Sequence, residues 1–298
     1  GKGTVHLEDF EQSDLILVIG QNPGTNHPRM LTALRDAKKM GARIVSINPL
    51  PETGLQRFKH PQDYMSGDFH STQLADLHVP VRIGGDAALF KGVMKILVEQ
   101  HAFDESFIDL KTIQFNDFKR SLDDFSWKEI EEDSGIERET IKQLAALCAE
   151  SNATIACWAM GLTQHRNGVA VIQEVVNLLL MGGHIGRPGA GLCPVRGHSN
   201  VQGDRTVGIW EAPSESFIEK LENGLKFPIP RQHGYDVVHS IHAMEKAEVD
   251  VFISMGGNFL SATPDTKRTA AALQKVGLTV QVSTKLNRSH LITCLLYT

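Results

Sequence analysis

The stretch DLILVIGQNPGTNHP, residues 14–28, decides the fold class of this chain. It opens with a short apolar run that ends in a glycine, which is typical of a strand buried on both faces. A helix is expected next, over residues 28–40, with Asn26 placed to cap it and Pro28 suited to its first turn. The run RIVSI at residues 43–47 then predicts a second strand. This β-α-β order implies parallel strands joined by a right-handed crossover.

The same pattern recurs late in the chain, where VFISMGGN occupies residues 251–258. A shift of 236 positions, from Gly20 to Gly256, superimposes the two stretches without a gap. Two β-α-β units of the dinucleotide-binding kind suggest two nucleotide ligands, or one ligand with two nucleotide arms. The alternative is a doubly wound fold that repeats the unit without binding a ligand at each copy. The shift also aligns Asn22 with Asn258, Pro28 with Pro264, Gly41 with Gly277, and Ile44 with Val280.

These patterns predict an α/β protein with two Rossmann-like units, whose parallel sheets are related by the internal repeat. We expect a first dinucleotide-cofactor-binding domain over residues 1–196 and a second, partial one over residues 197–298. The glycine-rich stretch 182–208 is expected to be a long loop that connects the two units. Periodicity predicts further elements of the first unit, namely a strand at 153–158 and helices at 86–100, 137–150 and 166–181.

The composition narrows the class of partner. The chain has 298 residues and a formal net charge of −5, which argues against nucleic acid or a membrane surface as the main partner. No apolar run approaches the roughly 20 residues that span a bilayer, and the N-terminus lacks the layout of a signal peptide. The four cysteines have no C-x-x-C spacing, so we expect no zinc or iron–sulfur site in this chain. Scattered, unpaired cysteines also favour a reducing, cytoplasmic setting. Both ends of the chain suggest an internal fragment.

The turn after the first strand carries the first candidate binding residues. Gly20 lets the backbone approach a phosphate, and the helix N-terminus behind it offers unpaired N–H groups and a partial positive charge. Asn22, Thr25 and Asn26 are expected to add side-chain donors for a diphosphate, and Pro23 belongs to the same turn. The spacing is not G-x-G-x-x-G, so the ordinary nicotinamide-dinucleotide signature is absent. A plain turn before a capped helix is the alternative interpretation.

Further candidates fall at the ends of other expected strands. Asn48 ends the second strand, where dinucleotide folds often have an acid that binds ribose. Asp86 follows two glycines, and its carboxylate suits the edge of a guanine base; equally, it simply caps the helix that begins at Ala87. Gly161 and Gln164 lie in the turn after the strand at 153–158 and are expected to face a ligand.

The segment PVRGHSNVQG, residues 194–203, gathers polar groups between glycines. Arg196 is able to hold an anion or a developing negative charge, and His198 is able to transfer protons near neutral pH. Taken alone, such a segment is more often a solvated loop. His239 and His242 share one face of an expected helix, but two imidazoles without further ligands predict an amphipathic helix and no metal site.

In this order, the motifs resemble those of the molybdopterin oxidoreductases of the dimethyl-sulfoxide-reductase type. Within that family they are most similar to formate-dehydrogenase-like, YdeP-like alpha subunits. The likeness extends over nearly the whole chain. It rests on SDL at 13–15 leading to GQNP at 20–23, GLTQHRNG at 161–168, GRPGAG at 186–191, VRGHSNVQG at 195–203 and MGGN at 255–258.

The resemblance implies a bis(molybdopterin guanine dinucleotide) cofactor that carries molybdenum or tungsten, with one nucleotide arm on each Rossmann-like unit. It implies that Asn22 and Asp86 touch one arm, and that Asn258 and the segment after it serve the other. Arg196 resembles the family's arginine close to the metal, where it would hold formate or a similar small anion. A 4Fe-4S cluster, the protein ligand to the metal and a possible electron-transfer partner are expected outside this chain.

The chain departs from the family pattern at three positions. Asn48 stands where the family usually has Asp, Leu50 where it often has Arg, and His198 where formate dehydrogenases tend to have Gln. Two-electron chemistry on formate is the leading interpretation for the full-length protein, and this piece alone is expected to be inactive. The alternatives are a cofactor-free scaffold within a redox complex, or a nicotinamide-dependent dehydrogenase.

Overall fold

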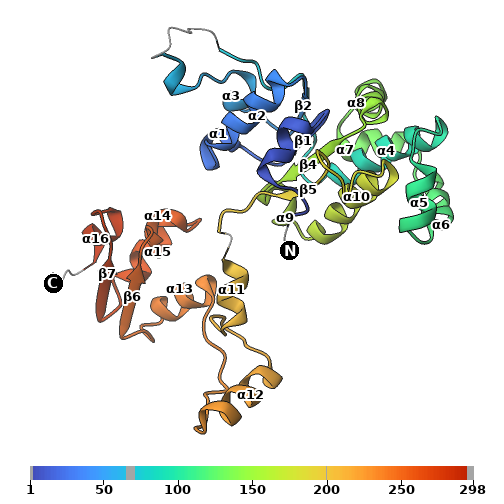
Figure 1. The fold of residues 1–298 in the computed structure, drawn as a ribbon. Coiled ribbons are helices and arrows are strands. Elements are labelled where there is room, and N and C mark those ends of the chain that lie inside the picture. The colour runs from blue at the N-terminus through green and yellow to red at the C-terminus, as the bar shows by residue number, and fades with distance from the viewer. Residues whose placement is uncertain (1–2, 65–70, 199, 294–298) are drawn as a thin grey trace. The chain divides into compact units, whose positions relative to one another are not determined.

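The chain folds as two units, residues 1–198 and residues 199–298. The computed structural model describes residues 3–64, 71–198 and 200–293. Each unit contains a β-α-β element with parallel strands (Figure 1). The expected α/β fold, with two Rossmann-like units related by an internal repeat, is therefore confirmed.

The strand at residues 15–19 is the centre of the first sheet. β1 (Leu15–Ile19) pairs in parallel with β2 (Arg43–Ile47) on one side and with β4 (Thr154–Trp158) on the other. β3 (Leu77–Val79) and β5 (Gly191–Pro194) extend the sheet to the order β3-β2-β1-β4-β5, with every pairing parallel. All residues of β1 are buried, as its uninterrupted apolar run predicted.

Helices cover both faces of this sheet (Figure 1). Alternate side chains of a strand point to opposite faces, so Leu17 of β1 packs in one core cluster while Ile16 and Val18 pack in the other. The cluster around Leu17 is completed by α4 (Asp86–Glu99), α8 (Arg138–Glu150) and α10 (Gly168–Met181), and the other by α2 (Met30–Lys39).

The helices and the strand expected from periodicity are confirmed as α4, α8, α10 and β4, each within two residues of the expected bounds. No helix in the described part of the chain is long and apolar enough to cross a membrane. Besides α1 (Pro23–Asn26), the shorter helices of the first unit are α3 (Thr53–Gln56), α5 (Glu105–Lys111), α6 (Phe115–Ser121), α7 (Trp127–Ser134) and α9 (Met160–Thr163). The unit also has 3-10 turns at Leu7–Gln12, Pro61–Tyr64 and Leu122–Asp124.

The helix expected over residues 28–40 is divided in two. α1 (Pro23–Asn26) is a separate short helix, and α2 begins only at Met30. Asn26 therefore ends α1 and does not cap the longer helix, so that expectation was wrong. The N-cap of α2 is Arg29, which makes no side-chain cap.

Residues on either side of α1 explain the division. Asn22 caps the start of α1 by accepting a hydrogen bond from the Thr25 N–H. Pro28 disfavours helical backbone at the residue before it, and His27 accordingly has φ −141° and ψ 59°. The chain leaves helical geometry at His27, and α2 begins two residues after the proline.

The glycine-rich stretch 182–208 is not one long loop. It contains β5, an edge strand, and the helix α11 (Val201–Thr206). Gly191 and Pro194 obscure the strand pattern, because both residue types are depleted in strands and proline is tolerated mainly at sheet edges. The boundary between the two units also falls in this stretch.

The second unit has a smaller sheet, in which β6 (Val251–Met255) pairs in parallel with β7 (Leu278–Val282). Its buried core consists of Met244, Leu260, Ala272 and Leu273. The helix expected around His239 and His242 is present as α13 (Val237–Glu245). In addition to α11 and α13, the unit contains the helices α12 (Glu215–Leu225), α14 (Phe259–Ala262), α15 (Thr266–Leu273) and α16 (Arg288–Ile292).

The two β-α-β elements correspond closely. β6 and α14 begin and end 236 positions after β1 and α1. The second strands differ, because Leu15 pairs with Arg43 whereas Val251 pairs with Leu278. The later element is thus one residue shorter between its strands, and the gap-free alignment of the second strands was wrong by one residue.

Candidate functional site

The carboxyl ends of the five parallel strands lie at one edge of the first sheet. β2 and β3 lie on one side of β1, and β4 and β5 on the other. In doubly wound sheets, ligands bind outside the carboxyl ends of the strands at such a switch point. Every binding or catalytic residue predicted for this unit follows the carboxyl end of one of these strands.

Gly20 and Gly161 touch each other at the switch point between β1 and β4. Gly20 has φ +56°, and its carbonyl accepts a hydrogen bond from the Gly161 N–H at 3.1 Å. A Cβ added to Gly161 would lie 2.5 Å from the Cα and the carbonyl oxygen of Gly20. The packing of one turn on the other therefore requires glycine at both positions, independently of any ligand.

Glu52 joins the two asparagines that the sequence singled out at the ends of β1 and β2. Asn22 Nδ2 donates to one carboxylate oxygen of Glu52, and Asn48 Nδ2 donates to the other at 2.9 Å. Asn22 Oδ1 also accepts from the Thr25 N–H at 3.1 Å. An acid therefore does lie near the end of β2, where dinucleotide folds often have one, but Glu52 supplies it.

Two buried polar atoms flank α1. Gln21 Nε2 donates to the Met30 sulfur at 3.1 Å, and the Oε1 atom of the same side chain is buried. His27 Nε2 lies 2.8 Å from the backbone carbonyl of Arg196, and His27 Nδ1 is buried. Among the residues that the structure describes, neither Gln21 Oε1 nor His27 Nδ1 has a hydrogen-bonding partner, which is uncommon for buried polar atoms. Both atoms fit a site that a bound ligand completes.

Asp86 is a buried carboxyl group at the same edge. It is the first residue of α4, its exposed fraction is 5%, and the N-cap is Gly85, so the alternative that Asp86 caps the helix was wrong. Burial raises the pKa of Asp86 from 3.8 to about 6, against the opposing effects of its own N–H and of His165. A buried carboxyl group whose pKa lies near neutral pH is a candidate for ligand recognition.

The remaining candidates of the two turns differ in exposure. Pro23 is buried as the first residue of α1, whereas Thr25 and Asn26 are exposed. Gln164 is exposed at the C-terminal end of α9. The exposed polar side chains are therefore accessible to a ligand outside the strand ends.

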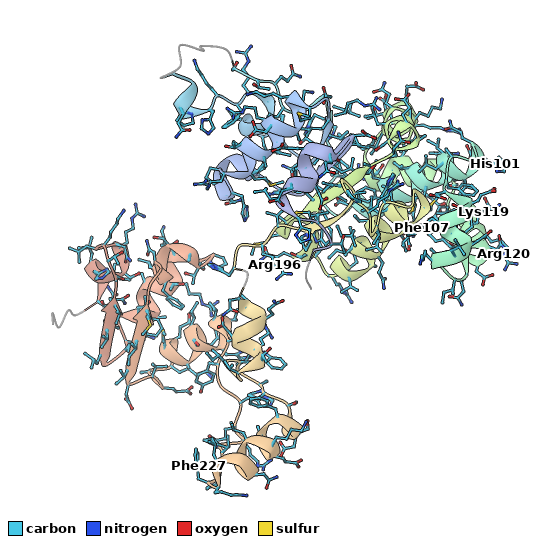
Figure 2. All side chains as sticks on the ribbon, viewed as in Figure 1. His101, Phe107, Lys119, Arg120, Arg196 and Phe227 are labelled. Atoms are coloured by element: carbon cyan, nitrogen blue, oxygen red, sulfur yellow. The ribbon has the colours of Figure 1, made fainter. Side chains whose placement is uncertain are left out.

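The segment after β5 brings Arg196 to this edge (Figure 2). The Val195 N–H donates to the Trp158 carbonyl at 2.8 Å, which continues the pairing with β4. The Arg196 carbonyl then meets His27 Nε2 from the turn after β1. The backbone on either side of Arg196 is thus hydrogen bonded to β4 and to the turn after β1. His198, the last residue of the first unit, is exposed.

The second unit repeats the capped turn. Gly256, with φ +68°, follows β6 at its carboxyl end. Asn258 Oδ1 accepts from the Ser261 N–H at 3.3 Å and from Ser289 Oγ at 3.2 Å, so it caps α14. Asn287, the N-cap residue of α16, donates from Nδ2 to the carbonyl of the glycine before Asn258 at 3.0 Å, which ties the start of α16 to this turn.

Sequence reasoning missed Glu52 and His27. Glu52 belongs to no motif, and its only signal is a carboxylate four residues after Asn48. His27 contacts a backbone carbonyl 169 positions away, a distance that no local pattern encodes. Within residues 3–64, 71–198 and 200–293, no group of three or more His, Cys, Asp or Glu side chains is arranged to hold a metal ion.

Comparison with known proteins connects these turns to one family. The family model described as molybdopterin oxidoreductase matches residues 3–290. An uncharacterized oxidoreductase of Mycobacterium tuberculosis is 51% identical over 98% of this chain and 38% of its own length. Protein YdeP of Escherichia coli K12 is 48% identical over 98% of this chain and 40% of its own length. Formate dehydrogenase H of the same organism is 24% identical over 92% of this chain and 37% of its own length.

The fold comparison agrees with the sequence comparison. The structure of acetylene hydratase from Pelobacter acetylenicus superimposes with a TM-score of 0.60 and 17% identity, over 92% of this chain and 41% of the other. The chain spans only 38–40% of the length of these two curated relatives, and about half of the aligned residues are identical. Because the family model covers nearly the whole chain, including both capped turns, the chain belongs to the molybdopterin oxidoreductase family.

Proposed function

We propose that this chain is the central cofactor-binding part of an oxidoreductase that uses bis(molybdopterin guanine dinucleotide) with molybdenum or tungsten. The observation that carries the proposal is the recurrence of one capped turn in two units. Gly20 and Asn22 in the first unit, and Gly256 and Asn258 in the second, have the same backbone and capping geometry after a parallel strand. Two equivalent turns suit a cofactor with two equivalent nucleotide arms.

In the first unit, the residues that would hold a nucleotide arm are those whose polar atoms lack a hydrogen-bonding partner among the described residues or can exchange their present partner for the ligand. Gln21 Oε1 and His27 Nδ1 are buried acceptor or donor atoms beside the turn. Asn22, released from Glu52, has an amide N–H group to offer a diphosphate. Asp86 is suited to the N–H groups of a guanine edge, because a carboxylate accepts with both oxygens. Thr25, Asn26, Asn48 and Gln164 would add polar contacts around them.

The substrate would be formate or a similar small anion, in line with the relationship to formate dehydrogenase H. The bound metal centre would supply two-electron redox chemistry. Arg196 would hold the carboxylate through its planar guanidinium, and His198 would transfer the proton. A 4Fe-4S cluster, an electron-transfer partner and a cytoplasmic location complete the proposal for the full-length protein.

The test of the cofactor is its stoichiometry in the anaerobically purified full-length protein. We expect one molybdenum or tungsten and two guanine nucleotides per chain, measured by elemental analysis and by nucleotide release in acid. Asn22→Ala and Asn258→Ala should each lower the nucleotide content. Full-length protein that folds but holds neither metal nor nucleotide would instead support a cofactor-free scaffold, and bound nicotinamide would support a dehydrogenase.

The test of the substrate uses Arg196 in the metal-loaded enzyme. Formate oxidation with an artificial electron acceptor should fall roughly 100- to 1000-fold in Arg196→Ala, the range for loss of one electrostatic stabiliser. Arg196→Lys keeps the charge but loses the two-pronged geometry, so it should recover only part of the activity. His198→Gln should change the pH profile more than the maximum rate. Near-normal turnover of Arg196→Ala at full metal content would place the substrate elsewhere.

A further inference from the structure

Two cysteines face each other across the neighbouring strands β4 and β5. Cys157 and Cys193 are register partners, and both side chains pack in the core cluster on the α2 face of the sheet. Neighbouring strands lie about 4.8 Å apart, which is within the roughly 4.4–6.8 Å that separate the Cα atoms of disulfide-bonded cysteines. Both cysteines are free thiols in the structure, and each thiol influences the pKa of the other.

The two thiols differ in exposure and in proton affinity. The hydrogen bond between them, together with burial, raises the pKa of the Cys157 thiol well above its ordinary value. The same hydrogen bond lowers the pKa of the Cys193 thiol, which is only half-buried. Cys193 is therefore the first of the two to ionise, with Cys157 donating its S–H to the thiolate. Thiolates are the reactive form of cysteine toward oxidants and disulfides.

A cavity gives small molecules access to this pair. Its volume is about 1250 Å³, and Cys193, Val195, Met30 and Phe58 are among its lining residues. Cys157, the register partner of Cys193 on β4, is fully buried. Cys148, on α8, provides a contrast within the same unit, because burial raises the pKa of its thiol to about 12.

We propose that Cys157 and Cys193 form a peroxide-reactive pair that closes reversibly to a disulfide. The Cys193 thiolate attacks one oxygen of hydrogen peroxide, the O–O bond breaks, hydroxide leaves, and Cys193 becomes a sulfenic acid. The Cys157 thiol then loses its proton and attacks the Cys193 sulfur, the S–O bond breaks, and water leaves. The two sulfurs lose two electrons in total, which reduce the peroxide. A disulfide between directly paired parallel strands is expected to be strained and hence easily reduced by a dithiol.

The experiment uses the 298-residue chain with Cys294→Ser, which removes the cysteine outside the described residues. The folded protein is exposed to hydrogen peroxide, free thiols are alkylated, and the modified peptides are identified by mass spectrometry. We expect a cross-linked pair of peptides that contain Cys157 and Cys193, reopened by dithiothreitol, with Cys148 recovered as the alkylated thiol and therefore not oxidised. In Cys157→Ala, dimedone should trap a sulfenic acid at Cys193. In Cys193→Ala, oxidation of Cys157 should slow by roughly tenfold or more, since the attacking thiolate is gone.

Two outcomes would overturn the proposal. One is oxidation of Cys193 to sulfenic or sulfinic acid while Cys157 remains fully alkylatable. The other is a pair that stays reduced in the folded chain under peroxide that oxidises the urea-unfolded chain. Circular dichroism and a Cys193→Ser variant guard against misfolding of the alanine variants. The inference is independent of the proposed cofactor, because the assay needs neither metal nor turnover.

Discussion

The two β-α-β elements have the same turn in different surroundings. All of β1 is buried, whereas Val251, Ile253 and Met255 of β6 have exposed fractions of 52%, 63% and 82%. Yet the glycine after each strand has a left-handed backbone, and the asparagine two residues later caps a four-residue helix in both. Local sequence is thus sufficient for the turn, while burial of the strand depends on what packs against it.

The neighbours of each strand explain the difference. Leu15, Leu17 and Ile19 of β1, which correspond to the three exposed residues of β6, are covered by the α4, α8 and α10 layer. β1 also pairs on both edges, with β2 and with β4. In the part of the second unit that the structure describes, β6 pairs with β7 in a two-stranded sheet. Large contiguous apolar surfaces normally mark places that other chain segments or partners cover.

The largest expected effect contrasts matched positions on the two first strands. Leu17→Ala should destabilise the first unit by about 2–5 kcal/mol, because Leu17 is fully buried and truncation leaves a cavity. Ile253→Ala, 236 positions later, should change the stability of the second unit by no more than about 0.5 kcal/mol. Urea unfolding followed by hydrogen-exchange mass spectrometry resolves the two units. Equal losses would show that β6 is as well packed as β1.

The next contrast concerns the two left-handed glycines. Gly20→Ala would place a side chain on a left-handed backbone, and its Cβ would lie 2.8–2.9 Å from atoms of Gly161 and Leu162. We therefore expect the free energy of unfolding to fall by about 3 kcal/mol. Gly256→Ala has the same backbone strain, but among the described residues no atom lies within 4 Å of its Cβ, so a loss of about 1–2 kcal/mol is expected. The same unfolding assay applies. A Gly256 variant as damaged as the Gly20 variant would mean that the second turn is also closely packed.

The pH-dependent stability that Asp86 contributes should be confined to the first unit. The pKa of Asp86 is raised to about 6 in the folded state, from 3.8. The folded state therefore binds this proton more tightly, and the stability that it confers is complete below pH 4 and is lost as pH rises through 6. Asp86→Asn should therefore stabilise the first unit at pH 7 by about 2–3 kcal/mol relative to the parent, with the gain vanishing near pH 4.

The measurement is the difference in unfolding free energy between Asp86→Asn and the parent at pH 4, 5, 6 and 7. The second unit, whose Asp236 and Glu245 have lowered pKa values, serves as the internal control. A difference that does not change with pH would contradict the raised pKa.

The smallest contrast separates the two capping asparagines. Asn22→Asp keeps the cap oxygen but replaces the amide donor to Glu52 with a second negative charge, so a loss of about 1–2 kcal/mol is expected at pH 7. Asn258→Asp keeps its acceptor for Ser261 and Ser289, so it should be neutral within about 0.5 kcal/mol. Glu52→Gln in the Asn22→Asp background should restore stability. Failure of that rescue would remove Glu52 as the cause.

Much of the candidate site was predicted because its chemistry is local. The positions of Gly20 and Gly256 follow from apolar runs that end in glycine, and the position of Gly161 follows from the turn after the run at residues 153–158. The division between α1 and α2 was missed because the competing cap, Asn22, lies in the turn before the helix and outside the helical pattern. β5 was missed because an edge strand with glycine and proline has no periodic signal.

The residue pattern alone predicted the two β-α-β elements, the parallel pairing of the strands within each, and a glycine turn with an asparagine two residues later in both. These features depend on residues within about one β-α-β unit, whose backbone preferences act locally. Only the tertiary structure decided that Glu52 joins Asn22 to Asn48, that His27 meets the Arg196 carbonyl, and that Cys157 lies opposite Cys193. The physical reason is that such contacts arise when the sheet brings the carboxyl ends of strands far apart in sequence to one edge, or sets two strands in register. Their stability comes from the burial and packing of the whole unit and not from the residues that touch.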